Sequence, residues 1–203
     1  MSDKLSLFKE LALSRRSLRV YDDRSISKAL LQQILTIATW APSAHNRQPW
    51  RFAVVTEKSR QEQLAQAMGE RLRADLEADG VPKAVIQKDT KRSYERITGA
   101  SVLICLCISM IDMDCYPDEK RSNAEQVMTT QSAAMAGQNL LLAAHAAGVG
   151  ACWMCAPLFC QDVVQNVLEL PEDWEPQALL TMGYPAQQRE RAREPLETRV
   201  LWR

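Results

Sequence analysis

The sequence lacks the signatures of several common protein classes. Its 203 residues contain only two histidines and seven glycines, and the formal net charge is zero. There is no G-x-G-x-x-G fingerprint and no P-loop motif, which argues against a Rossmann-type dinucleotide site and a P-loop nucleotide site. Because a neutral chain has no long-range field that attracts phosphates, we expect neither nucleic acid nor an anionic membrane surface as a partner.

Long hydrophobic runs are also missing. The longest apolar stretch, Val102–Ile108, is far shorter than the roughly 20 residues that a membrane-spanning helix needs. Charged residues interrupt the N-terminal stretch, so the sequence does not suggest a signal peptide, and we expect a cytoplasmic protein. A hydrophobic content of 46% and a charged content of 25% are typical of a globular protein. The length predicts one domain over residues 1–203.

Six cysteines are present, but their placement does not suggest a metal site. Cys105 and Cys107 lie two positions apart in a strand-like run, so both side chains should face the same side of a sheet. Cys152 and Cys155 form a C-x-x-C motif in another strand-like run, where a spacing of three places them on opposite faces. Matched zinc ligands are missing because histidines are so few. We expect no metal, and we favour small buried cysteines over thiol-redox chemistry.

Hydrophobic periodicity predicts an α+β fold with a central sheet of four to five strands flanked by helices. Two successive helices between some strands argue against simple βαβ alternation. Ser27 should cap a helix that includes Leu30–Ala38, and Asp112–Asn123 should form a polar loop. Other helices are expected over Asp3–Leu13, Lys58–Ala78, Val81–Ile97, Ala124–Ala147 and Cys160–Leu168, and strands over Arg51–Thr56, Ala100–Met110, Ala151–Cys155 and Gln177–Gly183.

Two segments carry more apolar residues than a solvent-exposed position would suit. Ala124–Ala147 is apolar nearly all round, which requires burial in a core or between subunits. The tail, residues 184–203, is basic but finishes with Val200, Leu201 and Trp202. Since apolar termini usually dock on a surface, we expect this tail to pack on a partner subunit.

The most informative segment is the loop Ala41–Trp50, with the sequence APSAHNRQPW. Pro42 and Pro49 fix the backbone and remove hydrogen-bond donors, so the loop should be stiff. Asn46 and Gln48 offer paired amide donors and acceptors, which suit the edge of a flat heterocycle. A rigid polar loop at the mouth of a strand is typical of a ligand platform.

Two guanidiniums and a hydroxyl stand together earlier in the chain, at Arg15, Arg16 and Ser17. A planar guanidinium binds oxyanions through two parallel hydrogen bonds, so this group suits a phosphate dianion. On its own, an Arg-Arg pair is usually a solvated surface turn. Its position roughly thirty residues before the polar loop makes the phosphate interpretation more specific.

Together these segments resemble the nitroreductase family of FMN-dependent oxidoreductases. The resemblance implies a central mixed sheet and an intertwined homodimer with a long central helix, an exchanged C-terminal tail and FMN at the interface between the subunits. It extends over nearly the whole chain. The matching segments are Arg15–Ser17, Pro42–Trp50, Gln131–Ala147, Gly148–Trp153, Gly183–Pro185 and Arg193–Leu196.

The resemblance also implies roles for individual residues. The implied cofactor contacts are Arg15, Arg16, Ser17 and Arg193 at the phosphate and ribityl oxygens, Pro42, Ser43 and Ala44 from the opposite subunit, Asn46 and Gln48 at the ring edge or ribityl chain, and Val149 and Gly150 against the ring plane. Commoner family members carry two hydroxyl residues after the proline, where this chain has Ser43 followed by Ala44. His45 is a candidate proton donor, although flavin chemistry needs no protein base. Trp50 and His145 are expected in the core.

Within the family, one subgroup is the most similar. It is the flavin-reductase domain of the enzyme that completes the deazaflavin coenzyme, and the matching residues include Cys115–Asp118, Arg121 and Leu170–Pro176. The resemblance implies that Tyr116, Asp118 and Arg121 cover the acceptor. It further implies ping-pong hydride transfer from NADH or NADPH through flavin N5 to a conjugated or nitro-type acceptor, with a dehydro precursor of that coenzyme as one candidate.

Two other functions remain open from the residues alone. The chain could be a flavin-binding module without catalysis, in which Arg15–Ser17 and the loop Ala41–Trp50 retain a flavin that is never reduced. It could also be a thiol protein that uses its cysteines. Retention and bleaching of a flavin would distinguish all three functions.

Overall fold

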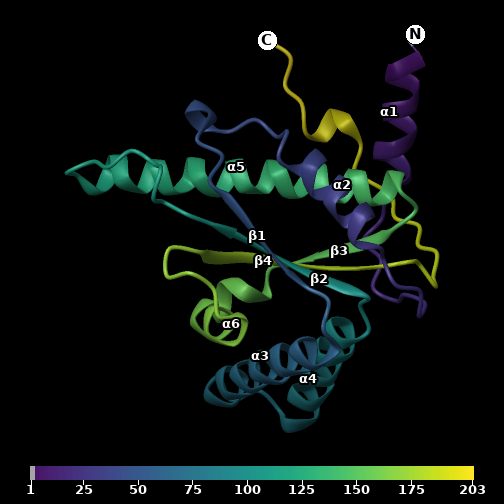
Figure 1. Cartoon of the computed structure of the whole chain (residues 1–203), viewed down its shortest axis with the longest axis vertical. Coiled ribbons are helices and arrows are strands. Elements are labelled where there is room, and N and C mark those ends of the chain that lie inside the picture. The colour runs from purple at the N-terminus through teal and green to yellow at the C-terminus, as the bar shows by residue number, and fades with distance from the viewer. Residues whose placement is uncertain (1–2) are drawn as a thin grey trace.

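The computed structural model describes residues 3–203 and has an antiparallel sheet at its centre (Figure 1). Four strands lie in the order β1 (Trp50–Val55), β2 (Val102–Ile108), β4 (Glu175–Gly183) and β3 (Gly150–Met154). All three pairings between these strands are antiparallel. The parallel pairing expected of a mixed sheet is limited, in the described residues, to one bridge between Ser17 and Ala151. The α+β class and a sheet of four strands are confirmed.

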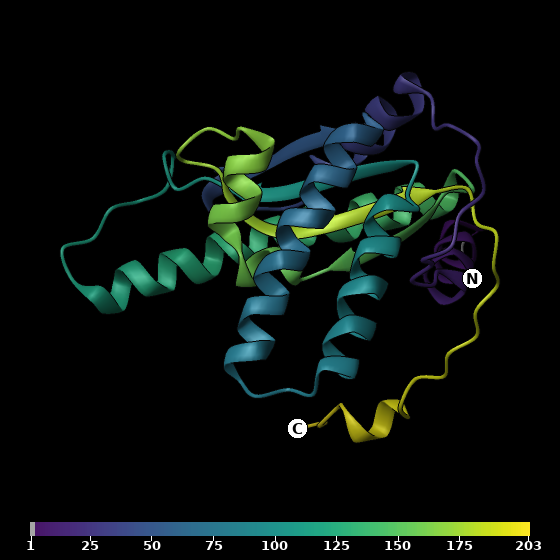
Figure 2. The same cartoon turned by 90° about the horizontal axis from the view of Figure 1, so that it is seen from below.

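Helices cover both faces of the sheet. The long helix α5 and helix α2 lie on one face, while α3, α4 and α6 lie on the other (Figure 1). Seen from below, α3 and α4 form a hairpin that extends beyond the sheet (Figure 2). The helix bounds are α1 Asp3–Ser14, α2 Lys28–Ala38, α3 Lys58–Ala78, α4 Lys83–Thr98, α5 Glu119–Ala146 and α6 Gln161–Leu168, with short 3-10 turns at η1 Ala44–Asn46, η2 Ala156–Phe159 and η3 Leu196–Thr198.

Strand β2 shows why the sheet needs helices on both faces. All seven of its residues are buried, as the continuous apolar run predicted. Alternate residues such as Ile104 and Leu106 pack toward α2 and α5, whereas Leu103 and Cys105 pack toward α3 and α6. The strand therefore divides two hydrophobic cores that share one sheet.

The predicted elements agree with the structure except at the start of α5. The loop expected over Asp112–Asn123 is wrong in its second half, because α5 begins at Glu119. Asp118 caps this helix by accepting a 2.9 Å hydrogen bond from the backbone N–H of Arg121. Ser27 caps α2 as expected, through the backbone N–H of Leu30.

The cysteines are placed largely as the strand pattern predicted. Cys105 and Cys107 are buried side by side, with their sulfur atoms 3.6 Å apart. Cys152 is buried in β3, while Cys155 follows the strand and is exposed. Among residues 3–203, no group of three or more His, Cys, Asp or Glu side chains has the arrangement of a metal site. No helix in the same range is long and apolar enough to cross a membrane.

Gly183, the last residue of β4, is required by close packing. A Cβ atom there would lie 2.6 Å from both Cβ and Cγ of Tyr21. Tyr21 cannot retreat easily, because its buried hydroxyl donates to Leu18 O and contacts the hydroxyl of Thr181 at 2.9 Å. Burial is the main reason that the pKa of this phenol is raised far above its usual range.

We predict that Gly183→Ala lowers the free energy of unfolding by about 1–3 kcal/mol, as expected for overpacking against a fixed ring. Chemical denaturation would measure this. Gly69→Ala is the matched control: nothing lies within 4 Å of its added Cβ inside α3, so helix propensity should raise stability by about 0.5–1 kcal/mol. Equal effects of the two substitutions would contradict the packing explanation.

Candidate functional site

The segment after α1 and the C-terminal tail lie side by side at one end of the sheet. Leu18 N donates to Ala151 O at 3.1 Å and Ser17 forms an isolated parallel bridge with Ala151, so this segment lies beside β3. The tail returns along the same segment, through a bridge between Tyr21 and Pro185 and a 3.1 Å hydrogen bond from Ala186 N to Val20 O. This pairing brings two arginine-rich stretches together, although they are far apart in sequence (Figure 2).

The arginine cleft, as we name it, lies between these stretches. Its first compartment has a volume of about 220 Å³ and its second about 380 Å³, and the two share Arg19 and Arg189. Glu95 is the sole acidic side chain among their lining residues. The first compartment is lined by Arg15, Arg16, Ser17, Arg19, Arg189, Arg191 and Arg193, and the second by Arg19, Val20, Tyr21, Arg92, Glu95, Arg96, Gly99, Gln187 and Arg189.

Most charges of the cleft are uncompensated within residues 3–203, where Arg92 is the sole lining arginine with an ion pair, to Asp89 at 2.8 Å. Burial lowers the pKa of Arg15, and the neighbouring guanidiniums of Arg193 and Arg16 lower it further. Burial also lowers the pKa of Arg96, and repulsion from Arg19 and Arg92 lowers it further. Like charges gathered in a partly buried cavity are stabilised by an anion, and a phosphate dianion matches the guanidinium fork.

Arg16 is oriented differently from its neighbour. Its Nη1 donates to Leu13 O at 2.6 Å and to Arg15 O at 2.8 Å, so its head group closes the end of α1. Its Nε is buried and has no hydrogen-bond partner within residues 3–203. The side chain lines the cavity and carries this buried, unsatisfied donor.

Val149 and Gly150 lie at the junction of α5 and β3. Gly148 ends the helix with a φ of +72°, and Val149 N donates to Ala144 O at 2.8 Å. A Cβ on Gly150 would lie 3.2 Å from Leu18 Cδ1, so this glycine allows close packing of the segment that carries Ser17. Neither Val149 nor Gly150 lines the arginine cleft, and their contact with a cofactor stays a prediction.

The loop around Asn46 forms a strained turn, which we name the amide turn (residues 43–48). His45, Asn46 and Gln48 all have a positive φ, of 50°, 54° and 52°. This backbone region costs an L-residue about 1–2 kcal/mol, least for Asn and His. Hydrogen bonds within the turn offset the strain, including 3.0 Å from Gln48 N to Ser43 Oγ. Pro42, Asn46 and Gln48 are left exposed, and the two amides are joined by a 3.4 Å hydrogen bond from Gln48 Nε2 to Asn46 Oδ1.

The amide turn and the arginine cleft do not meet in one protomer. None of the residues that line the cleft belongs to the range 42–48. In Figure 1 the turn, in dark blue, rises above α5, whereas the segment after α1 lies at the right-hand end of that helix. The two halves of the expected site can therefore serve one ligand only if a second copy of the chain supplies the turn.

The three residues expected at the acceptor lie together beside the start of α5. The guanidinium of Arg121 stacks over the ring of Tyr116, with 4.9 Å between its carbon and the ring centroid. Arg121 also forms an ion pair with Asp118. The backbone N–H and the guanidinium of Arg121 both hold the pKa of Asp118 below its usual range. Asp118 is therefore a helix cap first, and any role toward an acceptor is secondary.

His145 is not the core residue that its apolar helix predicted. It is half-buried in the last turn of α5, where its Nε2 lies 2.8 Å from Ser14 Oγ at the end of α1. Burial lowers its pKa, and the charges of Arg15 and Arg16 lower it further. The prediction failed because α1 and the arginine cleft approach this end of α5. Trp50, in contrast, is buried as expected.

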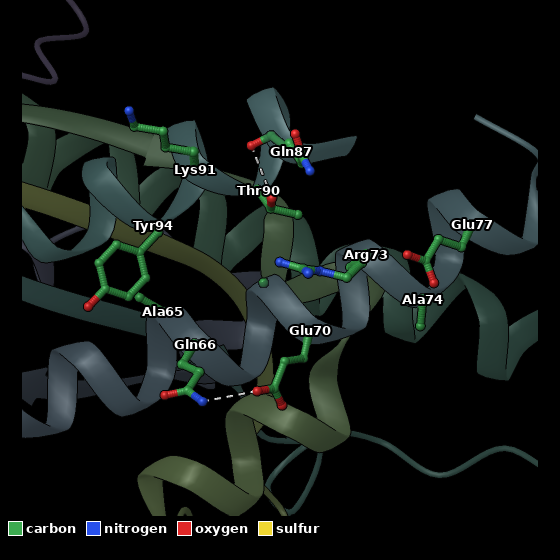
Figure 3. A pocket seen from close by; sticks show the side chains of 11 residues that line it. Ala65, Gln66, Glu70, Arg73, Ala74, Glu77, Gln87, Thr90, Lys91 and Tyr94 are labelled. Atoms are coloured by element: carbon green, nitrogen blue, oxygen red, sulfur yellow. Dashed lines mark hydrogen bonds between the residues drawn. The ribbon is translucent and has the colours of Figure 1, made fainter. Parts of the chain in front are cut away.

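A larger hollow between α3 and α4 has a volume of about 590 Å³ but a different character (Figure 3). Its walls carry Glu70 and Glu77 together with Arg73 and Lys91, so the opposite charges balance. Glu70 is also engaged by Gln66 at 3.0 Å. Without a net charge or unpaired buried groups, this hollow is a weaker candidate for a site than the arginine cleft.

Comparison with known proteins assigns the chain to a family. Residues 12–184 match the model of the Nitroreductase family, so the chain belongs to that family, and the resemblance noted from its motifs is confirmed. A Thermus thermophilus protein named NADH dehydrogenase is 31% identical, over 96% of this chain and 95% of that protein. A Methanothermobacter thermautotrophicus protein described as an NADH dehydrogenase or NAD(P)H nitroreductase is 30% identical, over 88% and 77%.

Solved structures agree with this assignment. A protein from Desulfovibrio desulfuricans, described as a nitroreductase in complex with FMN, is 28% identical with a TM-score of 0.75, over 96% of this chain and 95% of that chain. A BluB-like flavoprotein from Clostridium difficile 630 shares the fold with a TM-score of 0.80 at 20% identity, over 96% and 98%.

Several arginines of the cleft were missed from the sequence. Arg15, Ser17 and Arg19 alternate along an extended segment, as do Arg189, Arg191 and Arg193, which places each set on one side of the chain. That alternation was a usable signal. Arg96 had none, because only the packing of α4 against the segment after α1 brings it to the cleft.

We predict that His145 reports anion binding at the cleft. Its pKa should lie below the usual range in the free protein and rise when sulfate neutralises the nearby guanidiniums. Because the folded-state pKa is depressed, the free energy of unfolding should also fall as the pH drops below about 6.5.

Proton NMR titration with and without sulfate measures the pKa directly. His45→Gln removes the other imidazole of the chain and so assigns the signal. A pKa that does not respond to sulfate would show that the anion binds away from Arg15 and Arg16.

Proposed function

We propose that this protein is an FMN-dependent oxidoreductase that takes hydride from NADH or NADPH and passes it to a conjugated or nitro-type acceptor. The observation that carries the proposal is the arginine cleft, whose guanidiniums lack a counterion of their own among the described lining residues of the first compartment. The FMN complex of the Desulfovibrio desulfuricans relative supports the choice of anion.

The lining residues fit FMN at both ends of the cleft. Arg15, Ser17 and Arg193 would bind the phosphate, and the unpartnered Nε of Arg16 would add a further donor. Arg19 and Arg96 in the second compartment would place positive charge where the ring system lies. When bound, FMN would accept hydride at N5 and deliver it to the second substrate in a ping-pong reaction. Positive charge beside the ring favours its reduced, electron-rich form.

The remaining contacts would come from a second subunit. The amide turn would supply Ser43, Ala44, Asn46 and Gln48, together with the preceding Pro42, as the family resemblance implies. Two features support a homodimer: α1 has no buried residue, and Trp40 and Trp202 are 82% and 87% exposed. The tail that carries Trp202 would dock on the partner. His45 is exposed within the turn and would be placed to deliver a proton.

Acceptor selection is assigned to Tyr116, Asp118 and Arg121. The stacked guanidinium and phenol form a flat surface beside the start of α5, with the charge of Arg121 paired to Asp118. Such a surface would suit a planar aromatic acceptor. The subgroup resemblance makes a dehydro precursor of the deazaflavin coenzyme the acceptor to assay first. An enzyme that oxidises NADPH but yields no product from this precursor would remove the subgroup from the proposal.

Burial disfavours the thiol alternative at Cys105 and Cys107. Cys105 and Cys107 are close enough to interact, but both are fully buried. The hydrogen bond from Cys107 and burial both raise the pKa of Cys105, so its reactive thiolate is scarce. The flavin-binding module without catalysis is separated from the enzyme by experiment.

We predict that the protein purifies yellow and that NADH or NADPH bleaches it under argon. Absorbance spectroscopy measures both properties in one preparation. Flavin that is retained but never bleached would favour the binding module. A colourless protein that does not take up added FMN would refute the proposal.

We further predict that Arg15→Ala and Arg193→Ala each weaken FMN binding about 10- to 100-fold, the usual loss for a charged hydrogen bond. Riboflavin, which lacks the phosphate, should lose little affinity. Fluorescence titration measures both ligands. Arg73→Ala in the hollow between α3 and α4 is the control and should leave both affinities unchanged. Equal losses for FMN and riboflavin would mean that these arginines do not contact phosphate.

A further inference from the structure

We propose that Asp114 is a positioning residue for the amide turn, and that it ties this turn to the loop expected to cover the acceptor. The loop comprises residues 109–118, and we name it the acceptor loop. The inference rests on the proposed function, because the turn matters for catalysis only if it contacts a flavin. It assigns a role to residues that neither the sequence motifs nor the family assignment singled out.

Two ion pairs join the turn to the acceptor loop. Arg47, which lies between the residues with positive φ, binds Asp114 with 2.7 Å between Nη2 and Oδ1. Arg51, just beyond the turn, binds Asp112 at 3.3 Å. Arg51 also donates a 3.1 Å hydrogen bond to the carbonyl of Gln48, so it binds the last residue of the turn as well.

The acceptor loop is in turn fixed to α5 by a buried carboxylate. Glu125 is 1% exposed, and its Oε1 accepts a 3.3 Å hydrogen bond from the backbone N–H of Asp114. Its other oxygen, Oε2, is buried without a partner among the described residues. About two turns further along the helix, Ser132 is equally buried and accepts a 3.3 Å hydrogen bond from Ala44 N. Helix α5 therefore holds both the acceptor loop and the amide turn.

The strained backbone of the amide turn explains why the turn needs these contacts. Three residues of the turn occupy a backbone region that L-residues avoid, and such conformations persist only when their surroundings enforce them. Asp114 connects the buried Glu125 to the turn itself, through its own backbone N–H on one side and its carboxylate on the other. Releasing it would leave the turn free to relax and would misplace the amides of Asn46 and Gln48.

The same connection links two events in the site. An acceptor that moves the acceptor loop would also move Asp114, and through Arg47 it would shift the amides beside the flavin. Occupancy of the acceptor site would then change the surroundings of the ring. The arginine cleft takes no part in this coupling, since none of its lining residues contributes to the two ion pairs.

The test compares Asp114→Ala and Arg47→Ala with the double variant Arg47→Asp/Asp114→Arg, which restores the pair in reverse. Asp162→Ala is the matched control, because it removes an ion pair of the same 2.7 Å length between α3 and α6. Hydrogen exchange of residues 43–48 in the flavin-free protein is the primary measurement. The secondary measurements are the visible circular dichroism of bound FMN and the rate of acceptor reduction.

We expect the single variants to speed exchange in the turn at least about tenfold, with the reversed pair recovering most of the protection. Turnover with the acceptor should fall about tenfold, since small displacements of positioning groups are costly. The melting temperature should stay within about 3 °C, because an exposed ion pair contributes little to global stability.

Two results would overturn the inference. One is turn exchange in Asp114→Ala that matches Asp162→Ala, and the other is a reversed pair that behaves like the sum of the single variants. Failure of the proposed function is distinguishable. In that case the protein would not bind FMN, while hydrogen exchange would still report whether Asp114 holds the turn.

Discussion

Repulsion among the guanidiniums of the arginine cleft is the interaction on which the proposed function depends. Six arginines line its first compartment, without an acidic side chain among the lining residues. Gathering like charges in a partly buried space costs free energy, which the lowered pKa of Arg15 reflects. A protein that maintains such a cavity gains most when a dianion fills it, and FMN provides one in its phosphate.

Contacts with uncharged parts of the fold hold the cationic segments in place despite this repulsion. Leu18 is hydrogen-bonded to Ala151 of β3, and Tyr21 holds the same segment through the backbone of Leu18 and the hydroxyl of Thr181. Glycines at 150 and 183 leave room for this segment and its tyrosine to approach the sheet. The tail then pairs with the segment and brings Arg189, Arg191 and Arg193 to the cavity. Local packing thus determines where the charge is held.

The sequence predicted more of the fold than of the site. Continuous and alternating apolar patterns placed β2 and α3 within two residues of their observed bounds, because burial decides those elements. The early start of α5 was missed, although Pro117, Asp118 and Glu119 form a recognisable helix-start signal. His145 was misplaced because its environment depends on α1, which no local pattern encodes. The separation of the amide turn from the cleft in one protomer has no local signal either, and only the family resemblance implied it, by assigning Pro42, Ser43 and Ala44 to the opposite subunit.

Phosphorus NMR of the FMN-loaded protein tests the central claim most directly. A free phosphate monoester takes up its second proton at a pH near 6. If the arginine cleft binds the cofactor phosphate as a dianion, its resonance should keep a constant chemical shift from pH 8 to about pH 5. A bound phosphate that titrates near pH 6, as in free FMN, would contradict the account and place the phosphate outside the cleft.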